Sequence, residues 1–401
     1  MNITIISNIL PYPLVSGGAQ AQFNMIDELR KKHNISFIFT EDGKNKRSAM
    51  KKLKKMWPEV NFYLFSYARQ LCYPKFLYEK ARRAIQLKFI PNNLHFQIER
   101  TIRPYGVEFS HDFISFVNRI IKQNHTDIIQ VEFFPCLHIV NYLPKDIKKI
   151  FIHHEIRYVR NRRLLKGFKL SNKEKKQLDL SYKTEIYDLN QYDSIITLTE
   201  QDKKILEQDG VISPIHISPA AVNTEVLPYQ EWNGNISFVG GYAHIPNQEG
   251  IEWFIDNVLP LLDNNIHLDI VGGGWPSYYS KNNISLKGFV DNLAQNIHGS
   301  IMIVPILTGS GMRMKILEAA AMSLPFVTTS IGVEGLNFKD HESCLIADTP
   351  EDFAQSIIKL SMDAKLRKSL AERANLIFKN QYSKKVLADV RDDTYLKILQ
   401  L

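Results

Sequence analysis

Cysteine is scarce in this sequence and long hydrophobic runs are missing, and both absences narrow the class of protein. Its 401 residues include three cysteines, Cys72, Cys136 and Cys344, whose spacing fits neither a metal site nor a disulfide framework. No stretch approaches the roughly 18 consecutive apolar residues of a membrane span. The opening residues also lack the basic start of a signal peptide. We therefore expect a protein of the reducing cytoplasm that binds no metal.

The length and composition predict two folded domains. One domain usually holds about 100–200 residues, and 44% hydrophobic with 23% charged residues supply enough apolar surface for two cores. No short repeat or low-complexity tract is present. Two domains leave a cleft in which a ligand can bind.

Positive charge is concentrated in the first half of the chain. Residues 1–220 carry 35 Lys and Arg against 22 Asp and Glu, a net +13, whereas residues 221–401 carry 15 against 20, a net −5. Two basic clusters stand out, at residues 44–55 and 157–169. They suit a polyanion or an anionic membrane surface, although a solvated helix surface explains them equally well.

The N-terminal half begins like a doubly wound parallel sheet. A buried-type strand at Ile3–Ser7 precedes a loop with Gly17 and Gly18, a helix at Ala19–Lys31 and a strand at Ile35–Thr40. Further strands are predicted at Ile128–Glu132, Ile150–His153 and Ser194–Leu198, the last followed by a helix cap at Thr199–Asp202. Residues 44–125 show no such alternation, and we expect them to be mainly helical.

The same pattern starts again after a connector at residues 220–235. Strands are predicted at Ile236–Val239, His267–Val271, Ile284–Leu286, Ile301–Pro305 and Phe326–Thr328, with helices at Asn247–Val258 and Met314–Met322. We therefore predict an α/β protein with two Rossmann-like, doubly wound domains that face a central cleft. Their bounds are residues 1–220 and 221–383, and a final helix at about 384–401 packs back on the first domain.

The segment from Val304 to Ala319 carries the strongest chemical signal. A strand leads into a turn with Gly309, Ser310 and Gly311, and then into a helix. The glycines allow the backbone to approach a ligand closely, and the free N–H groups of the new helix attract an anion. Arg313 and Lys315 add two positive charges at this helix start, where cations are unfavourable unless an anion is bound. Glu318 can accept hydrogen bonds from sugar hydroxyls.

Four ordered motifs in the C-terminal half resemble the retaining glycosyltransferases of family 4, which have the GT-B fold. The motifs are Phe238–Gly241 with Pro246-Asn247, Gly288–Asp291, Gly309–Glu318 with its G-x-G-x-R-x-K-x-x-E pattern, and Gly332–Gly335. The resemblance is strong over residues 236–350 and weak in the N-terminal half. It implies that Glu318 binds the ribose of a nucleotide-sugar donor.

The same resemblance implies roles for further residues. Gly309, Ser310, Gly311 and Met312 would lie beside the transferred sugar and the phosphates. Phe289 and Val290 would line the base pocket, Gly240 and Gly241 would belong to the donor site, and Gly17 and Gly18 would close on the diphosphate. No metal or other cofactor is expected in such a site.

Two departures from the family pattern matter. Ser310 occupies the position eight before Glu318 where members often carry a second glutamate. Gly241 and Pro246 occupy positions where many members carry an arginine and a lysine. Because a departing diphosphate needs cationic partners, Arg313 and Lys315 are the natural replacements.

A pair of histidines ends the strand at Ile150–His153. The carboxyl end of a strand is where a doubly wound sheet places ligand-binding residues, and the family resemblance places a histidine like His154 near the donor sugar and the acceptor. His153 would point the opposite way, so these neighbours cannot converge on one metal ion. A purely structural role for His154 stays open.

We predict transfer of a hexose-type sugar from a nucleotide-diphosphate donor to a hydroxyl of a saccharide or lipid-linked acceptor, with retention. His154, Arg313 and Lys315 are the candidate catalytic residues. The setting would be cell-surface polysaccharide or glycolipid assembly, with the basic half on the inner membrane face. The alternatives are a nucleotide-sugar epimerase, a phosphorylase-like enzyme and a polyanion-binding protein. No nucleic-acid module is recognisable, and Ser16–Gln20 lacks the G-x-G-x-x-G pattern of a dehydrogenase.

Overall fold

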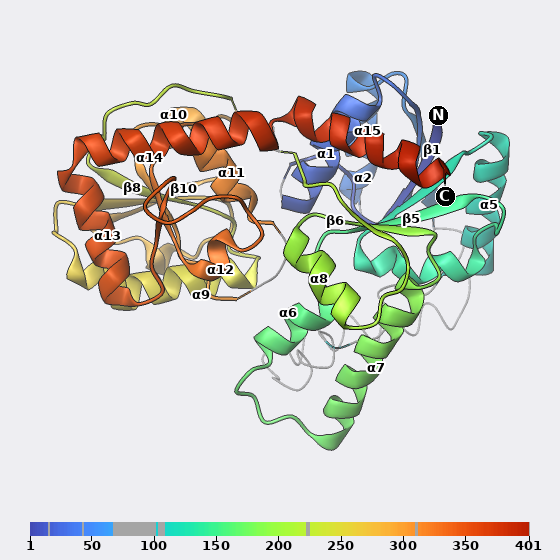
Figure 1. Ribbon diagram of the computed structural model, residues 1–401, viewed down its shortest axis with the longest axis horizontal. Coiled ribbons are helices and arrows are strands. Elements are labelled where there is room, and N and C mark those ends of the chain that lie inside the picture. Colours follow the sequence, from blue (N-terminus) through green and yellow to red (C-terminus); the bar gives the residue numbers. More distant parts are fainter. Residues whose placement is uncertain are drawn as a thin grey trace. The chain divides into compact units, whose positions relative to one another are not determined.

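The chain forms two compact units (Figure 1). A computed structural model describes residues 1–14, 17–41, 44–66, 102, 109–221, 225–308 and 312–400. Unit 1 consists of Met1–Ser218 with Arg391–Leu401, and unit 2 consists of Pro219–Val390. The sequence-based boundary near residue 220 falls beside the division between Ser218 and Pro219. The final helix α15 (Lys384–Gln400) contributes residues to both units.

A seven-stranded sheet, parallel throughout, organises the described part of unit 1. Its strand order is β3-β2-β1-β4-β5-β6-β7. The strands are β1 (Asn2–Ser7), β2 (Asn34–Glu41), β3 (Asn61–Ser66), β4 (Ile128–Glu132), β5 (Lys148–His153), β6 (Ser194–Thr197) and β7 (Ile215–Ile217). The order reverses between β1 and β4, and in such sheets ligands bind at the carboxyl ends of the strands that flank this switch point.

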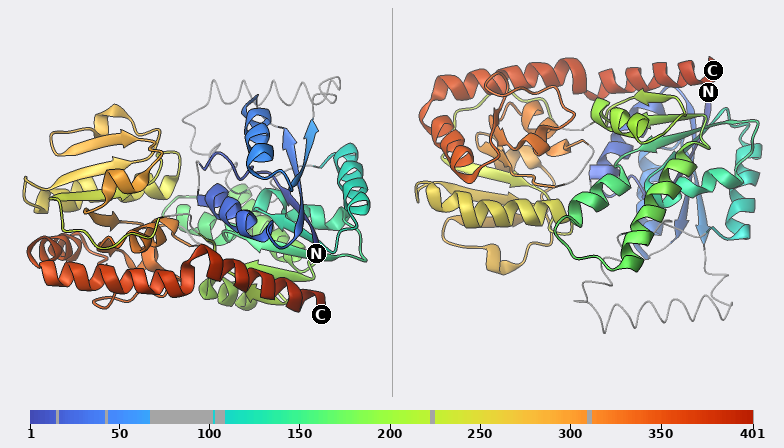
Figure 2. Two further views of the ribbon diagram at one scale, coloured as in Figure 1. Left: turned by 90° about the horizontal axis from the view of Figure 1, so that it is seen from above. Right: turned by 60° about the horizontal axis from the view of Figure 1, so that its bottom comes forward.

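Helices cover both faces of this sheet (Figures 1 and 2). One face packs on α5 (His111–Gln123), η2 (Phe134–Tyr142), α6 (Arg157–Leu164), α7 (Asn172–Leu189) and α8 (Glu200–Gln208) through one apolar cluster. Among the described residues, unit 1 also contains α1 (Gly17–Leu29) and α2 (Lys44–Met56). Helices α7 and α8 begin at N-cap residues that satisfy their first backbone N–H groups. Ser171 and Glu174 form a capping box at α7, and Thr199 caps α8.

Unit 2 holds a six-stranded sheet in the order β10-β9-β8-β11-β12-β13, with every pairing parallel. The strands are β8 (Asn235–Val239), β9 (His267–Val271), β10 (Ile284–Gly288), β11 (Ile301–Val304), β12 (Phe326–Thr328) and β13 (Leu345–Ile346). Its switch point lies between β8 and β11. The glycine turn after β8 and the motif after β11 therefore start from neighbouring strand ends.

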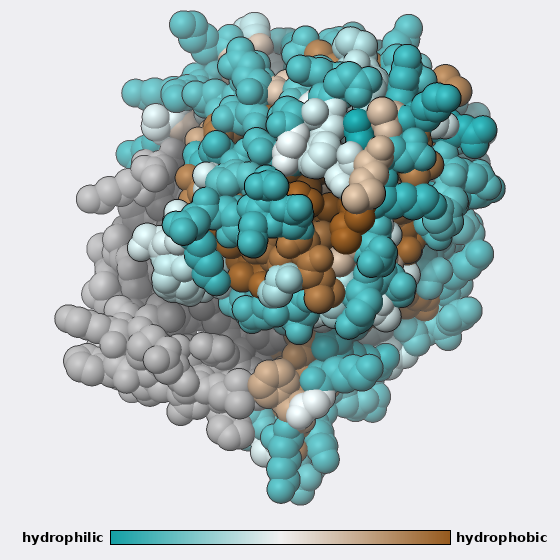
Figure 3. Space-filling model, turned by 90° about the vertical axis from the view of Figure 1, so that its left-hand side faces the viewer, coloured by the Kyte–Doolittle hydropathy of each residue, from teal (hydrophilic) through white to brown (hydrophobic). Residues whose placement is uncertain are grey.

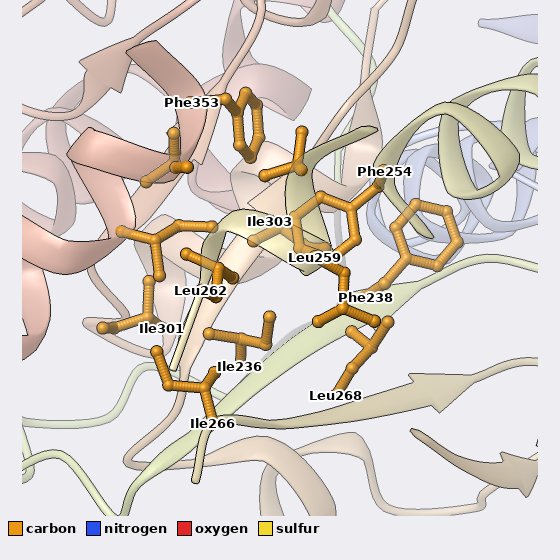
Figure 4. Close-up of a cluster of buried hydrophobic side chains, with 14 of the residues drawn as sticks. Ile236, Phe238, Phe254, Leu259, Leu262, Ile266, Leu268, Ile301, Ile303 and Phe353 are labelled. Atoms are coloured by element: carbon orange, nitrogen blue, oxygen red, sulfur yellow. The ribbon is translucent and has the colours of Figure 1, made fainter. Parts of the chain in front are cut away.

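The core of unit 2 forms between this sheet and its helices. Figure 4 shows Ile236, Phe238, Leu268, Ile301 and Ile303 of the strands together with Phe254, Leu259 and Phe353 of the helical segments. The helical segments are α9 (Ile245–Trp253), η3 (Phe254–Val258), η4 (Leu259–Leu261), η5 (Ser277–Tyr279), α10 (Leu293–Ile297), α11 (Met314–Ala321), α12 (Ser330–Val333), α13 (Pro350–Met362), α14 (Ala364–Ile377) and η6 (Phe378–Tyr382).

The surface of unit 2 is not uniformly polar. On the face shown in Figure 3, hydrophobic side chains gather in a hollow that hydrophilic side chains surround. In the described ranges of the chain, every helix is too short or too polar to cross a lipid bilayer.

Three strands in the described part of the chain were not predicted from the sequence. β3 lies within residues 44–125, so the expectation of a mainly helical segment is wrong at Asn61–Ser66; residues 67–101 and 103–108 lie outside the described residues. β7 and β13 have three and two residues, too few for a periodic pattern to show. Gly17 and Gly18, expected in the loop, instead form the first turn of α1.

Candidate donor and acceptor sites

A cationic cluster in unit 2 connects the segments that follow β8 and β11. We use this name for Asn247, Arg313, Lys315 and Glu318. The Lys315 Nζ donates to Asn247 Oδ1 at 2.7 Å, and the Asn247 Nδ2 donates to the carbonyl of Gly241 at 2.8 Å. One asparagine therefore ties the cation of α11 to the glycine turn across the switch point of the sheet.

Lys315 is held in surroundings that disfavour its charge. Its Nζ lies 4.2 Å from the centroid of the Phe238 ring, a cation–π contact that by itself favours the charged form, but burial outweighs it. Burial lowers the pKa of Lys315 to about 7, and the charge of Arg313 lowers it as well, while Glu318 opposes this. A bound anion would favour the charged form of this lysine, and a pKa shifted by burial and nearby charges marks a candidate functional site.

Arg313 and Glu318 complete this cluster from the same helix. Arg313 is the N-cap residue of α11, its side chain is 9% exposed, and its Nη2 lies 3.9 Å from Glu334 Oε2. Glu318 is buried one turn after Lys315, and burial raises its pKa to about 7 against the opposing charge of Lys315. Two cations and one carboxylate thus share the beginning of one short helix.

Glycines let the strand ends of this sheet approach one another closely. A Cβ on Gly240 would lie 2.5 Å from Asn247 Nδ2, and a Cβ on Gly272 would lie 2.3 Å from the Gly240 carbonyl oxygen. The Gly272 N–H donates to the Gly288 carbonyl at 2.8 Å, which brings the end of β10 alongside. Phe289 follows with a side chain that is 63% exposed, and Val290 is half-buried.

The structure brings some predicted donor residues together and leaves others outside its description. Gly240, Gly241 and Lys315 are linked through Asn247. Met312 is half-buried beside Arg313. Gly309, Ser310 and Gly311 lie outside the described residues. The sequence analysis did not assign a site role to Asn247, although its place in the first turn of the helix after a glycine turn was a usable signal.

A histidine cluster occupies the switch point of unit 1. We use this name for Gly18, Glu132, Phe133 and His154. The His154 Nε2 lies 2.9 Å from Glu132 Oε2, and the His154 ring stacks on Phe133 with centroids 4.1 Å apart and planes 11° from parallel. A Cβ on Gly18 would lie 2.8 Å from Phe133 Cε1, so only a glycine fits against this ring. Residues after β1, β4 and β5 therefore meet here.

Phe133 has an unusual backbone conformation for a bulky residue. Its φ is 66° and its ψ is 140°, outside the regions that side chains normally tolerate. Such strain is concentrated at functional sites. The turn that it makes after β4 places its ring between Gly18 and His154. Neither Glu132 nor Phe133 was assigned a role from the sequence, although Glu132 ends a predicted strand.

The two adjacent histidines point to opposite faces of the sheet, as predicted. The His153 Nε2 lies 3.2 Å from Glu185 Oε1, and both side chains are buried. Glu185 also accepts the backbone N–H groups of Arg157 and Tyr158 at the start of α6, each at 3.1 Å. His153 is therefore structural. In the described part of the chain, no group of His, Cys, Asp and Glu side chains could hold a metal ion.

Comparison with solved structures identifies the fold as GT-B. Sucrose-phosphate synthase from Thermosynechococcus elongatus superposes with a TM-score of 0.72 at 12% identity, with 100% of this chain and 99% of that chain covered. Anabaena HepE in complex with UDP superposes with a TM-score of 0.70 at 11% identity, covering 99% and 100%. Full-length coverage with parallel sheets in both units establishes the architecture.

Sequence comparison finds similarity to glycosyltransferases over part of the chain. Residues 233–363 match the family model described as glycosyl transferases group 1. A Klebsiella pneumoniae protein described as an uncharacterized 44.6 kDa protein in the cps region is 29% identical over 228 residues, 53% of this chain. An uncharacterized glycosyltransferase of Methanocaldococcus jannaschii is 28% identical over 213 residues, 50% of this chain. The matches span 58% of the length of each relative.

Proposed function

We propose that this protein is a glycosyltransferase that moves a sugar from a nucleotide-diphosphate-sugar to a hydroxyl acceptor with retention of anomeric configuration. The observation that carries the proposal is Lys315, a partly buried cation tied by Asn247 to the glycine turn of the same switch point. A cation in such surroundings costs free energy in the ligand-free protein. A diphosphate bound there removes that cost.

The chemistry rests on charge stabilisation of the leaving group. Arg313, Lys315 and the positive end of the α11 dipole would neutralise the departing nucleoside diphosphate. Glu318 would accept hydrogen bonds from the ribose hydroxyls, and Phe289 would cover the base. We expect no metal cofactor, since two cationic side chains supply the charge. Retention follows from the resemblance to family 4.

We assign contacts with the phosphates and with the acceptor hydroxyl to residues of unit 1. Gly17 and Gly18 begin α1, and the N-terminus of a helix suits a phosphate. His154 would position the acceptor hydroxyl or take its proton.

The comparisons favour this class of substrate. Anabaena HepE has been crystallised with UDP and with UDP-glucose, and the Klebsiella relative is described as lying in a cps region. Capsular or other cell-surface polysaccharide assembly, or glycolipid assembly, is therefore the setting that we propose.

Calorimetric titration with nucleoside diphosphates tests the donor site. Arg313→Ala and Lys315→Ala should each weaken UDP by about 10- to 150-fold, the loss of one charge-assisted hydrogen bond. They should also reduce kcat, because the leaving group gains charge in the transition state. Lys339→Ala, at a side chain that is 74% exposed, is the matched control. Unchanged UDP affinity in both site variants would disprove this assignment.

Incubation with a nucleotide-sugar but no acceptor separates the alternatives. An epimerase converts the donor under these conditions, whereas a transferase needs an acceptor and otherwise gives slow hydrolysis at most. A phosphorylase-like enzyme would instead require inorganic phosphate.

We further propose that unit 1 docks on an anionic membrane through a basic arm, which we define as residues 162–176, from the end of α6 through the connecting loop to the first residues of α7. The arm carries seven Lys and Arg residues and one acidic residue, Glu174, and Glu174 is buried in the capping box of α7. Phe168 is 46% exposed within the arm. Basic side chains with an exposed aromatic ring suit the interface of an anionic bilayer, which would bring the enzyme to a lipid-linked acceptor.

A further inference from the structure

Behind His154 lies a chain of buried polar side chains that the proposed reaction does not by itself explain. It runs from Tyr395 of α15 through Gln130 and Glu132 of β4 to His154. The Tyr395 hydroxyl bonds to Gln130 Oε1, the Gln130 Nε2 donates to Glu132 Oε1 at 2.6 Å, and Glu132 Oε2 lies 2.9 Å from His154 Nε2. Gln130, Glu132 and Tyr395 are each at most 3% exposed.

The direction of every hydrogen bond in this chain is determined by chemistry. An ionised carboxylate can only accept, so Gln130 must turn its amide N–H toward Glu132 and its oxygen toward Tyr395. Burial raises the pKa of Tyr395 to about 12, which keeps its hydroxyl protonated as the donor. The remaining oxygen of Glu132 lies beside His154 Nε2, and because a carboxylate oxygen accepts, Nε2 is the nitrogen that donates.

We propose that Glu132 is a positioning residue that holds His154 as the Nε2–H tautomer, so that Nδ1 is the atom that accepts the proton or the hydrogen bond of the acceptor hydroxyl. A neutral imidazole accepts through one nitrogen only. When Nδ1 takes a proton, both nitrogens carry hydrogen, and the Glu132 carboxylate stabilises the cation. This inference rests on the proposed function for the identity of the acceptor, but the tautomer is independent of it.

Two further contacts fix the ring in this orientation. Phe133 stacks on one face of the imidazole at 4.1 Å, and the Phe133 ring is itself held against Gly18. Glu132 is paired in register with Ser7 of β1 and Ile152 of β5, so its carboxylate projects from the middle of the sheet. The ring is thus held at its edge by Glu132 and at its face by Phe133.

The neighbouring pair, His153 and Glu185, shows what a structural pair looks like in the same strand. Glu185 accepts from two backbone N–H groups in addition to His153, so its carboxylate caps a helix. Glu132 accepts from side chains, and its chain of partners ends at a histidine that is 13% exposed. Glu185 therefore caps a helix, whereas the contacts of Glu132 suit the positioning of a histidine side chain.

Nitrogen-15 NMR of the full chain with labelled histidine tests the tautomer directly. The His154 signals are assigned by their loss in His154→Asn. The expected result is a protonated Nε2 protected from exchange and an unprotonated Nδ1, with the Nε2 proton lost to exchange in Glu132→Ala. A proton on Nδ1 in the unaltered protein, or an Nε2 proton equally protected in Glu132→Ala, would overturn the inference.

Steady-state kinetics then separate positioning from folding. Glu132→Ala should lower kcat by about 10²- to 10⁴-fold, the range of general acid–base catalysis, with the donor KM and UDP affinity changed less than about threefold. Glu132→Gln should restore part of kcat, because a flipped Gln130 lets the new amide oxygen accept from Nε2. A kcat within threefold of the unaltered enzyme in Glu132→Ala would refute a positioning role.

The matched control for the distant end of the chain is a second buried tyrosine. Tyr395→Phe removes the donor to Gln130, and Tyr192→Phe removes a buried hydroxyl that donates to the Leu137 carbonyl at 2.6 Å. Only Tyr395→Phe should lower kcat, by several-fold, and equal kcat values in the two variants would count against the chain. UDP titration of the unaltered protein is the separate check of the proposed function: if UDP does not bind, that function fails while the NMR result still decides the tautomer.

Discussion

Replacing Lys315 by methionine should raise the free energy of unfolding of the ligand-free protein at neutral pH, because the buried lysine destabilises the folded state there. The ordinary lysine pKa of 10.5 falls to about 7 in the folded chain because of burial. Between these two values the folded state binds fewer protons than the unfolded state, so stability rises with pH across this window. Methionine keeps an unbranched side chain, one atom shorter than that of lysine, and cannot titrate.

The size of the effect follows from the two pKa values. With one pKa unit worth about 1.36 kcal/mol, the lysine lowers stability by roughly 4 kcal/mol at pH 7 and by roughly 1.4 kcal/mol at pH 9.5. The lost contacts with Asn247 and Phe238 reduce the stability of the variant. Loss of the Lys315 charge also raises the pKa of Glu318 further, so the variant itself loses stability as pH rises above 7. The stability advantage of Lys315→Met over the unaltered protein should therefore shrink by at least about 3 kcal/mol between pH 7 and pH 9.5.

Urea unfolding followed by tryptophan fluorescence measures this change. Trp232, Trp253 and Trp275 lie in unit 2, and Trp57 alone lies in unit 1, so the signal reports mainly on the unit that holds Lys315. The control is Lys339→Met, because that lysine is 74% exposed and its replacement should change the stability by no more than about 0.5 kcal/mol.

A difference between Lys315→Met and the unaltered protein that stays constant within about 0.5 kcal/mol from pH 7 to pH 9.5 would refute the reasoning. Calorimetry provides a second reading. UDP binding at pH 8 should take up close to one proton in the unaltered protein, since the diphosphate raises the pKa of Lys315, and none at this position in the variant. Equal heats in buffers of different ionisation enthalpy would contradict the assignment.

Three further changes test other parts of the molecule. Glu318→Gln should weaken uridine and UDP alike by about 10-fold or more, because the ribose is common to both; a loss confined to UDP in titration calorimetry would move Glu318 to the phosphates. Gly18→Ala should lower kcat by roughly 10-fold at unchanged fold, since overpacking against Phe133 costs about 1–3 kcal/mol; steady-state turnover equal to that of the unaltered enzyme would contradict this. The double change Lys166→Glu with Lys169→Glu should reduce co-sedimentation with phosphatidylserine vesicles by at least about 30-fold, as each lysine near the surface contributes about 1 kcal/mol; equal binding to neutral and anionic vesicles would disprove docking through the basic arm.

Local sequence was sufficient for much of the fold. The strands that define both switch points, β1, β4, β8 and β11, are largely buried strands of four to six residues rich in isoleucine and valine, a composition and length that indicate a strand in the sequence. The helix cap at Thr199 and the opposite directions of His153 and His154 follow from rules that need only neighbouring residues. β3, β7 and β13 were missed because short or half-buried strands leave no distinct pattern.

Tertiary structure decided which of the candidate residues act together. Arg313, Lys315 and Glu318 share one helix and were visible as one motif, but the partner that ties Lys315 to the glycine turn, Asn247, is 68 residues away in the chain. Glu132 precedes His154 by 22 residues and Tyr395 follows Gln130 by 265. The order of parallel strands determines such meetings, because crossover connections bring the ends of non-consecutive strands side by side. Composition and residue spacing do not reveal that strand order. The sequence alone therefore indicated the residue types of the motif and their chemistry, and only the tertiary structure determined which residues are their partners.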